Sequence, residues 1–260
     1  MARESAGASE LKENGGPAPR LFKATAENYF DAPMRSYPLP MRLMLAVVVG
    51  ILGVLSKILF RWSVEDSQKL DRPRGSRGEV IICNHTSMPE IVCIYIHLYM
   101  KGRRCRPIYK SEFNKIKIAA WFFPRVGALS IERGTADMTC LRAAQHALQR
   151  GEDVIIFPEG TRIKTDDQPV EIHGGFALMA SMGKTDVVPM AVCGWRDITG
   201  GGTHGFRPVK CWIRAGERVG FEDAPAGLKR RDKQQWLEDE AMRRVYEMRD
   251  ALREEHPGRR

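Results

Sequence analysis

Few of the motifs that mark common enzyme classes occur in the 260-residue sequence. A G-x-S-x-G nucleophile elbow is absent, which argues against a serine hydrolase. A G-x-x-x-x-G-K-[ST] loop is also absent, and the glycine cluster "TGGGTHGF" (199–206) lacks the strand-to-helix context of a G-x-G-x-x-G site. A nucleotide-dependent enzyme is therefore not indicated, and the glycine cluster is expected to form a loop between two strands.

The six cysteines include no C-x-x-C pair, and several lie inside apolar runs. Four histidines outside the motifs described below show no metal-ligand spacing: His97, His146, His204 and His256. A zinc site and a disulfide framework both lack support, so we expect reduced cysteines packed as small hydrophobic side chains in a cytosol-facing domain. We expect no metal and no cofactor.

Positive charge is in excess, because 41 Lys and Arg stand against 32 Asp and Glu, a net charge of +9. This favours an anionic partner such as a phospholipid surface, a phosphate-bearing substrate or nucleic acid. Nucleic acid is the weakest of the three, because no binding motif is present and the basic residues are not gathered in one stripe.

The N-terminal third of the chain contains a low-complexity tail and an apolar run. Residues 1–38 are rich in Ala, Gly, Pro and charge, which predicts a disordered tail. The run "LMLAVVVGILGVLSKILF" (43–60) is eighteen residues long and as a helix would measure about 27 Å, slightly short of a ~30 Å hydrocarbon core. We predict a membrane-associated helix over 39–62, either marginally spanning or monotopic; a buried core helix is the alternative.

Basic residues are unequally divided between the two flanks of this run. Arg35 and Arg42 precede it, whereas five follow it: Arg61, Lys69, Arg72, Arg74 and Arg77. The imbalance favours a cytoplasmic position for the domain that follows.

From residue 79 onward, short β-rich runs alternate with helical patterns. Strands are expected at 79–83, 106–109, 128–131, 153–157, 187–192 and 209–213, and helices at 88–100, 112–123, 136–149 (with Thr135 as N-cap) and 175–182. This pattern predicts an α/β fold: a mixed, mostly parallel sheet flanked by helices, following the membrane-embedded N-terminal helix. The α/β domain is expected over 63–226, and an amphipathic helix packed on it or extending from it over 227–260.

The stretch "NHTSMPE" (84–90) directly follows the first of these strands, where ligands bind in open α/β sheets. His85 and Glu90 are candidates for a catalytic base and the acid that orients it. The alternative is structural, because Ser87, Pro89 and Glu90 fit a helix capping box.

Arginines follow two further strands. "GALSIERG" (127–134) contains Arg133, and "DVIIFPEGTR" (153–162) ends in Glu159, Gly160, Thr161 and Arg162. The glycine permits a tight turn, and guanidinium groups present a planar fork to phosphate. Taken singly, each arginine is more often a surface ion-pair partner.

In order, "NHTSMPE", "GALSIERG", "FPEGTR" and "VVPMAV" (187–192), after a hydrophobic helix, resemble the glycerolipid acyltransferase family of the 1-acylglycerol-3-phosphate type. The resemblance covers roughly residues 40–220, and "IYKSEF" adds Lys110 at a basic position of the family. Two residues depart from the family pattern: Glu90 replaces an aspartate, and His173 replaces a lysine or another basic residue. Aspartate at 90 is expected to keep or raise activity.

The resemblance implies that a membrane-bound enzyme moves an acyl group from acyl-CoA or acyl carrier protein to a lysophospholipid acceptor, most simply 1-acylglycerol-3-phosphate. His85 would be the base, Glu90 its orienting acid, and backbone N–H groups at the helix start would stabilise the oxyanion. The implied substrate-binding residues are Asn84, Lys110, Arg133, Glu159, Gly160, Thr161 and Arg162. Glycerol-3-phosphate or another lysophospholipid remains an alternative acceptor, and a catalytically impaired, lipid-binding scaffold remains an alternative function because of Glu90.

Overall fold

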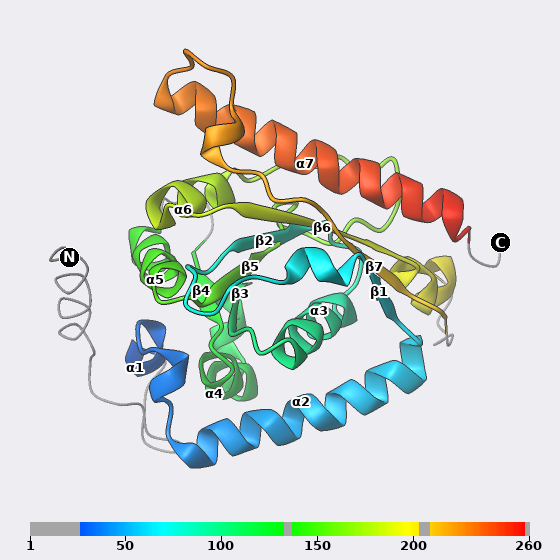
Figure 1. Cartoon of the computed structure of the whole chain (residues 1–260). Coiled ribbons are helices and arrows are strands. Elements are labelled where there is room, and N and C mark those ends of the chain that lie inside the picture. The colour runs from blue at the N-terminus through cyan, green and yellow to red at the C-terminus, as the bar shows by residue number, and fades with distance from the viewer. Residues whose placement is uncertain (1–26, 133–136, 203–208, 258–260) are drawn as a thin grey trace, which may run out of the picture.

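A seven-stranded sheet forms the centre of the computed structural model, which describes residues 27–132, 137–202 and 209–257 (Figure 1). The strand order is β1-β7-β6-β2-β5-β3-β4, and all neighbours are parallel except β6 and β7. The strands are β1 (Ser63–Glu65), β2 (Val80–Cys83), β3 (Cys105–Lys110), β4 (Leu129–Ile131), β5 (Asp153–Ile156), β6 (Val187–Cys193) and β7 (Trp212–Ala215). The predicted mixed, mostly parallel α/β sheet is confirmed.

Helices cover both faces of this sheet (Figure 1). They are α1 (Glu27–Phe30), α2 (Leu39–Phe60), α3 (Pro89–Met100), α4 (Lys117–Arg125), α5 (Met138–Gln149), α6 (Gly175–Gly183) and α7 (Arg230–Glu255), with short 3-10 helices η2 (Met34–Ser36), η3 (Ser67–Leu70), η4 (Ser111–Lys115), η5 (Trp195–Gly202) and η6 (Phe221–Asp223). Strand side chains alternate between faces: Val80 and Ile82 join the core under α5, α6 and α7, whereas Ile81 and Cys83 join the core shared with α2 and α3.

The apolar run forms α2, a helix of 22 residues that lies along the domain beneath α3 and α4 (Figure 1). One face is buried at Met41, Leu45, Val49, Ser56 and Phe60. Most of the other residues are exposed, and only 22% of its most apolar window is buried, so the alternative of a core helix is wrong. Within the described residues, α2 is the one helix long and apolar enough to cross a membrane.

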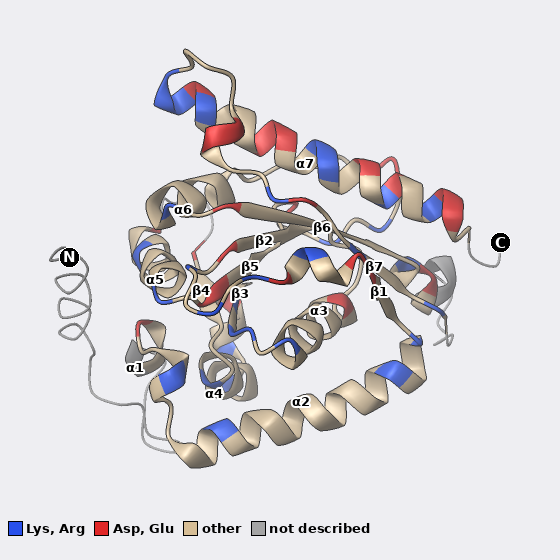
Figure 2. Cartoon of the chain, in the orientation of Figure 1, with Lys and Arg blue, Asp and Glu red and all other residues tan. Residues whose placement is uncertain are grey.

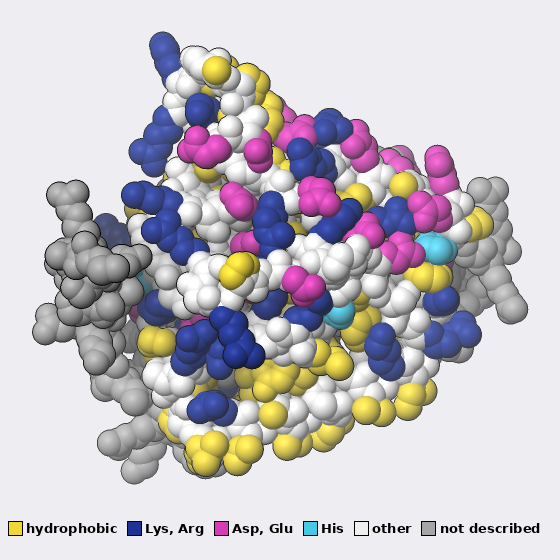
Figure 3. Space-filling view, in the orientation of Figure 1, with side chains coloured by type: hydrophobic (Ala, Val, Ile, Leu, Met, Phe, Trp, Pro, Cys, Tyr) yellow, Lys and Arg dark blue, Asp and Glu magenta, His cyan; other side chains and the backbone are white. Residues whose placement is uncertain are grey.

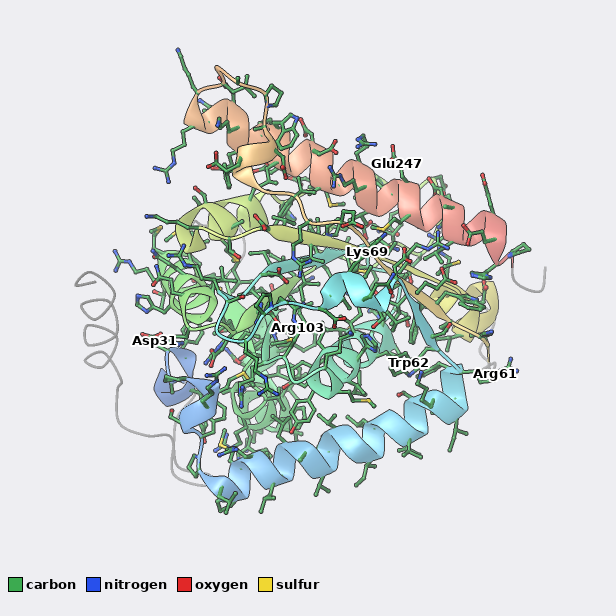
Figure 4. The ribbon with its side chains drawn as sticks, in the orientation of Figure 1. Asp31, Arg61, Trp62, Lys69, Arg103 and Glu247 are labelled. Carbon is green, nitrogen blue, oxygen red and sulfur yellow. The ribbon has the colours of Figure 1, made fainter. Side chains whose placement is uncertain are left out.

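The C-terminal end of α2 is tied to the residue pair that follows it. Arg61 adopts a left-handed conformation (φ +42°), which turns the chain toward β1; Figure 4 labels Arg61 and Trp62 at this corner. The ammonium of Lys57 lies 3.5 Å from the centre of the Trp62 ring and donates to the Trp62 carbonyl at 2.6 Å.

The expected disordered tail needs a correction for residues 27–38. They form α1 and η2, and Tyr29, Met34 and Tyr37 are buried. A residue far along the sequence holds this segment in place: Arg106 of β3 donates to its backbone carbonyl groups. Residues 1–26 lie outside the described part of the chain.

Several element boundaries differ from the prediction. The short strand β1 was not expected, and β7 begins at Trp212 rather than at residue 209. The helix expected over 112–123 is split into η4 and α4. Asp137 caps α5 by accepting from the Cys140 N–H at 3.0 Å, and the predicted cap Thr135 lies outside the described residues.

The C-terminal amphipathic helix packs on the sheet as α7. Its buried side chains are Leu237, Ala241, Met242, Val245 and Leu252. Figure 2 shows charges of both signs along α7, whereas α2 is almost uncharged. The two helices therefore give the two sides of the molecule opposite surface character.

Candidate active site

Two loops meet at the carboxyl ends of β2 and β5. These strands are parallel neighbours, with Ile82 opposite Ile156, so the chain that leaves each strand emerges at the same edge. The loops are joined directly by a hydrogen bond from the Ile163 N–H to the His85 carbonyl at 2.8 Å. The sequence motifs that follow these strands are therefore neighbours in space.

The imidazole of His85 is held from two sides. Its Nδ1 is hydrogen-bonded to Oε1 of Glu90, and its ring lies against Phe157 with 4.4 Å between ring centres. With Nδ1 donating to a carboxylate, Nε2 is the ring nitrogen that can accept a proton. The His85 side chain is 14% exposed, and it borders the cavity described below.

Glu90 also organises the main chain at the start of α3. Its carboxylate accepts from the Thr86 N–H (2.8 Å), the Thr86 hydroxyl (2.9 Å) and the Ser87 N–H (3.0 Å). One fully buried carboxylate thus contacts both the imidazole and the backbone ahead of α3, the contacts that the catalytic interpretation and half of the capping box require. The N–H groups of Thr86 and Ser87 are engaged by Glu90 and are not free to bind an oxyanion. Met88, not Ser87, precedes the helix as N-cap.

Burial raises the pKa of the Glu90 carboxyl above its ordinary value, while the hydrogen bonds from His85 and Thr86 act in the opposite direction. The donors that converge on Glu90 thus favour its charged form against the cost of burial. A carboxylate in this position fixes the imidazole orientation and stabilises an imidazolium when one forms.

Asn84 and Glu159, which were predicted to bind substrate, do not line the cavity described below. Asn84 is 1% exposed, and its amide is paired with the backbone of Val192 at 2.8 and 3.2 Å. Glu159 is 4% exposed; one oxygen accepts from the His85 N–H at 2.7 Å and the other from the Tyr246 hydroxyl at 3.1 Å. Both side chains shape the loops rather than the cavity wall.

A cavity of about 1060 Å³ opens between α2, α3, α4 and the sheet edge. Most of its wall is apolar and comes from α2 (Leu45, Val48, Val49, Leu52, Leu55, Leu59, Phe60), α3 (Ile91, Val92, Tyr95, Ile96) and the α4 region (Phe113, Phe122, Phe123). His85 lies in the same wall. The imidazole of His85 therefore borders a space large enough for extended hydrocarbon chains.

Polar groups border the same cavity. Lys110, Thr161, Arg162 and His173 are among its lining residues, and Gly160 turns the chain there with φ +59°. The expected tight turn at this glycine is confirmed, and the Gly160 N–H closes it on the Phe157 carbonyl at 2.9 Å. Gly174 and Gly175 bring the N-terminus of α6, with N–H groups that lack intrahelical acceptors, to the cavity as well.

His85, Arg133 and Arg162 were predicted to meet at one cleft. His85 and Arg162 both line the cavity, and Arg133 lies outside the described residues. The neighbouring Ile131 and Glu132 line the cavity, which shows that the chain leaving β4 reaches it. The structure also adds residues that sequence reasoning missed. Phe157 had a local signal, because it directly precedes "PEGTR", whereas Tyr246 is 87 residues from its partner Glu159 and had none.

One group of possible metal ligands occurs among the described residues, and it is remote from this cavity. Glu65, Glu255 and His256 have ligand atoms within 4.8 Å of one another. Arg214 donates to both carboxylates, at 2.5 Å to Glu65 and 3.1 Å to Glu255, and so compensates their charge. None of the three residues lines the cavity.

The chain is 27% identical to a chloroplastic 1-acyl-sn-glycerol-3-phosphate acyltransferase (LPAT1) of Arabidopsis thaliana over 149 residues, which are 56% of this chain and 40% of that protein. It is 28% identical to a 1-acyl-sn-glycerol-3-phosphate acyltransferase of Bacillus subtilis over 134 residues, 52% of this chain and 64% of that one. The chain thus spans about half the length of the curated relatives it matches.

A solved structure has the same fold. It is the 1-acyl-sn-glycerophosphate (LPA) acyltransferase PlsC from Thermotoga maritima, which matches 80% of this chain and 80% of its own with a TM-score of 0.59 and 22% identity. A family model described as Acyltransferase matches residues 61–193, just over half of the chain, including both loops of the site. The chain therefore belongs to the Acyltransferase family.

Proposed function

We propose that this protein is a membrane-bound O-acyltransferase that moves a fatty acyl group from an acyl thioester to the free hydroxyl of a lysophospholipid. The first acceptor to consider is 1-acylglycerol-3-phosphate, which would give phosphatidic acid, because relatives are named for that activity. The observation that supports the proposal most is the His85–Glu90 pair in the wall of a large apolar cavity that Lys110 and Arg162 also border.

The chemistry needs one proton acceptor, because a thioester is already activated toward nucleophiles. Nε2 of His85 takes the proton of the acceptor hydroxyl while the hydroxyl oxygen attacks the thioester carbonyl carbon. Glu90 stabilises the resulting imidazolium. When the C–S bond breaks, the proton returns from Nε2 to the thiolate sulfur, so an acyl-oxygen ester and a free thiol leave and His85 is restored.

Acceptor binding is assigned to the polar border of the cavity. The cations of Lys110 and Arg162, with the N-terminus of α6, suit a phosphate monoester, whose charge favours guanidinium, ammonium and backbone N–H donors. The apolar walls suit the hydrocarbon chains of donor and acceptor. The proposed donor is an acyl thioester of coenzyme A or of acyl carrier protein.

Membrane attachment is assigned to the exposed face of α2, with Ile116, Ile118 and Trp121 at α4 as a second apolar contact. Because α2 packs along the domain through one face, we propose that it lies in one leaflet and does not span. Both of its ends are then on one side of the bilayer. The charge imbalance between its flanks, which applies to spanning helices, no longer assigns that side, and the cytoplasmic position stays a prediction from cysteine usage.

The alternative of an impaired, lipid-binding scaffold rested on the longer side chain of Glu90. The direct contact between Glu90 and His85 Nδ1 removes that ground, because the added methylene does not prevent the pairing. The hypothesis of an active enzyme is therefore better supported than that of a scaffold, and the assay below tests both.

The test is a transfer assay with purified protein in lipid nanodiscs. Palmitoyl-CoA and palmitoyl acyl carrier protein are each offered with 1-acylglycerol-3-phosphate, glycerol-3-phosphate or lysophosphatidylcholine, and products are separated by thin-layer chromatography. We expect phosphatidic acid from the first acceptor. A folded protein that is inert with every combination would support the scaffold.

His85→Ala is the matched variant for this assay. We expect kcat to fall by roughly 10²–10⁴-fold, the range for removal of a general base. The protein should stay folded, because the Glu90 carboxylate keeps its donors from Thr86 and Ser87. Turnover close to wild type in a folded His85→Ala protein would remove His85 as the base.

A further inference from the structure

A side chain from the C-terminal helix reaches the catalytic loop. Tyr246 of α7 donates its hydroxyl to Glu159 Oε1 at 3.1 Å, and Glu159 Oε2 accepts from the His85 N–H at 2.7 Å. The helix α7 begins at Arg230, well past the residues matched by the family model (61–193). Two hydrogen bonds thus connect α7, which lies outside the matched residues, through Glu159 to the backbone of His85.

In these hydrogen bonds Tyr246 is a donor and Glu159 is a buried acceptor. Burial raises the pKa of the Tyr246 hydroxyl, so at neutral pH the phenol is protonated and acts as the donor. Glu159 is 4% exposed, so its carboxylate cannot exchange these donors for bulk water. Removal of the hydroxyl would leave one oxygen of a buried carboxylate without its donor.

The hydrogen bond to Glu159 helps to set the position of the His85 imidazole. Nδ1 of His85 is fixed by Glu90 and its backbone N–H by Glu159, so the ring and the main chain are held by two different carboxylates. If Glu159 turns, the backbone of His85 loses an acceptor and Nε2 moves relative to the cavity. Displacements of about 1 Å at a reacting group cost on the order of 10²-fold in rate.

We propose that Tyr246 is a positioning residue of the active site, which holds Glu159 and through it the main chain of His85. This inference rests on the proposed acyltransferase function for its kinetic part only. The packing of α7 does not depend on the hydroxyl, because five buried apolar side chains anchor the helix: Leu237, Ala241, Met242, Val245 and Leu252. A role in positioning is therefore separable from a role in folding.

The test compares Tyr246→Phe with Tyr37→Phe in the full-length protein. Tyr37 is the control because its buried hydroxyl donates at 3.5 Å to the Pro124 carbonyl, not to Glu159, and Tyr37 does not line the cavity. Hydrogen exchange at the His85 amide is read from overlapping peptides by mass spectrometry. We expect exchange at this amide to be roughly tenfold faster in Tyr246→Phe and unchanged in Tyr37→Phe.

Kinetics give a second readout. In Tyr246→Phe, kcat is expected to fall roughly tenfold while KM for the acceptor stays near wild type, because the hydroxyl does not line the cavity. Equal kcat and equal His85 amide exchange in Tyr246→Phe and wild type would overturn the proposal, and so would a fall in kcat without any change at that amide.

The pH profile separates positioning from a general loss of stability. Burial raises the pKa of Glu159, with Glu90 adding to the rise, whereas the donors His85 and Tyr246 lower it. Loss of the Tyr246 donor therefore raises the pKa of Glu159 further, so protonation begins at higher pH. The acid limb of kcat should move to higher pH in Tyr246→Phe, with the alkaline limb unchanged.

Two other titratable groups face Glu159: the buried Cys83 thiol at the end of β2 and Arg249, one turn along α7 from Tyr246. Neither is altered in the variants. If wild type is inert with every acceptor yet the His85 amide is exposed in Tyr246→Phe, the positioning role stands and the proposed reaction fails.

Discussion

At the scale of single residues, position 90 holds a glutamate where the family has an aspartate, which is one methylene shorter. Glu90 is the second residue of α3, and its carboxylate reaches back over the turn to His85, Thr86 and Ser87. A shorter acid at this position starts farther from those donors. The length of glutamate therefore suits this loop, and these contacts argue against the expectation that aspartate would do as well or better.

We expect Glu90→Asp to lower kcat by roughly tenfold, since a shorter carboxylate cannot keep both the imidazole and the backbone donors. Glu90→Gln keeps the length but replaces one acceptor oxygen with an NH₂ donor, so its loss should be larger, on the order of 10²-fold or more. Steady-state kinetics with thermal unfolding as the control measures both. Full activity in Glu90→Asp would mean that the loop adjusts to the shorter acid.

Residues that follow strands were predictable, and residues with distant partners were not. His85 and Arg162 were correctly expected at one cleft, because each comes shortly after a parallel strand and such strands end at one edge. Asn84 and Glu159 were assigned to substrate on the family resemblance. Their contacts with Val192 and Tyr246, which are 108 and 87 residues away in the sequence, could not be predicted. No local pattern identifies such pairs.

At the scale of elements, the segment before α2 depends on one buried ion pair. Arg106 is fully buried in β3, donates to Glu152 at 2.6 Å and also to the carbonyl groups of Tyr29, Phe30 and Ala32. Glu152 in turn accepts from the Met34 N–H at 2.6 Å. Figure 4 labels Asp31 in this segment, and its carboxylate pairs with Arg150 at 3.0 Å.

This clamp explains why composition mispredicted residues 27–38. The segment has no apolar period of its own, so its order could not be inferred locally. It is ordered because a guanidinium on the sheet supplies donors to backbone carbonyl groups that a short helix end leaves unpaired. The start of α2, and with it one wall of the cavity, is thereby tied to β3.

Arg106→Met should destabilise the protein by about 3 kcal/mol, the low end of the range for breaking a buried ion pair, because the buried Glu152 keeps only Arg150, at 3.7 Å, as a cationic partner. Adding Glu152→Gln removes the buried charge and keeps an acceptor for the Met34 N–H, so the double variant should recover part of the loss. Urea unfolding in detergent measures both. A double variant that is less stable than Arg106→Met alone would contradict this account.

At the scale of the whole molecule, the two sides differ in what they present to their surroundings. Figure 3 shows hydrophobic side chains in a row along the lower edge, where α2 lies, and mixed charges over the opposite side. The row is formed by α2 residues that do not line the cavity, Val47, Ile51, Val54 and Ile58, which are 56–67% exposed. The adjoining face of α2 lines the cavity, and Leu52, Leu55 and Leu59 are both exposed and part of the cavity wall. The proposed bilayer contact therefore adjoins the proposed site along α2.

A substitution in this row tests membrane binding without altering a residue of the cavity wall. Ile51→Glu places a charge where an in-plane helix meets the boundary between headgroups and acyl chains, so binding to phospholipid vesicles should weaken by on the order of tenfold. Met138→Glu is the matched control: it exchanges an exposed apolar side chain of α5, on the other face of the sheet, for the same charge. Vesicle flotation measures binding, and transfer to an acceptor dispersed in detergent should survive in both variants because neither residue lines the cavity. Equal flotation of the two variants would show that α2 does not hold the protein on the membrane, and loss of transfer in detergent would show that Ile51 serves the fold of the site instead.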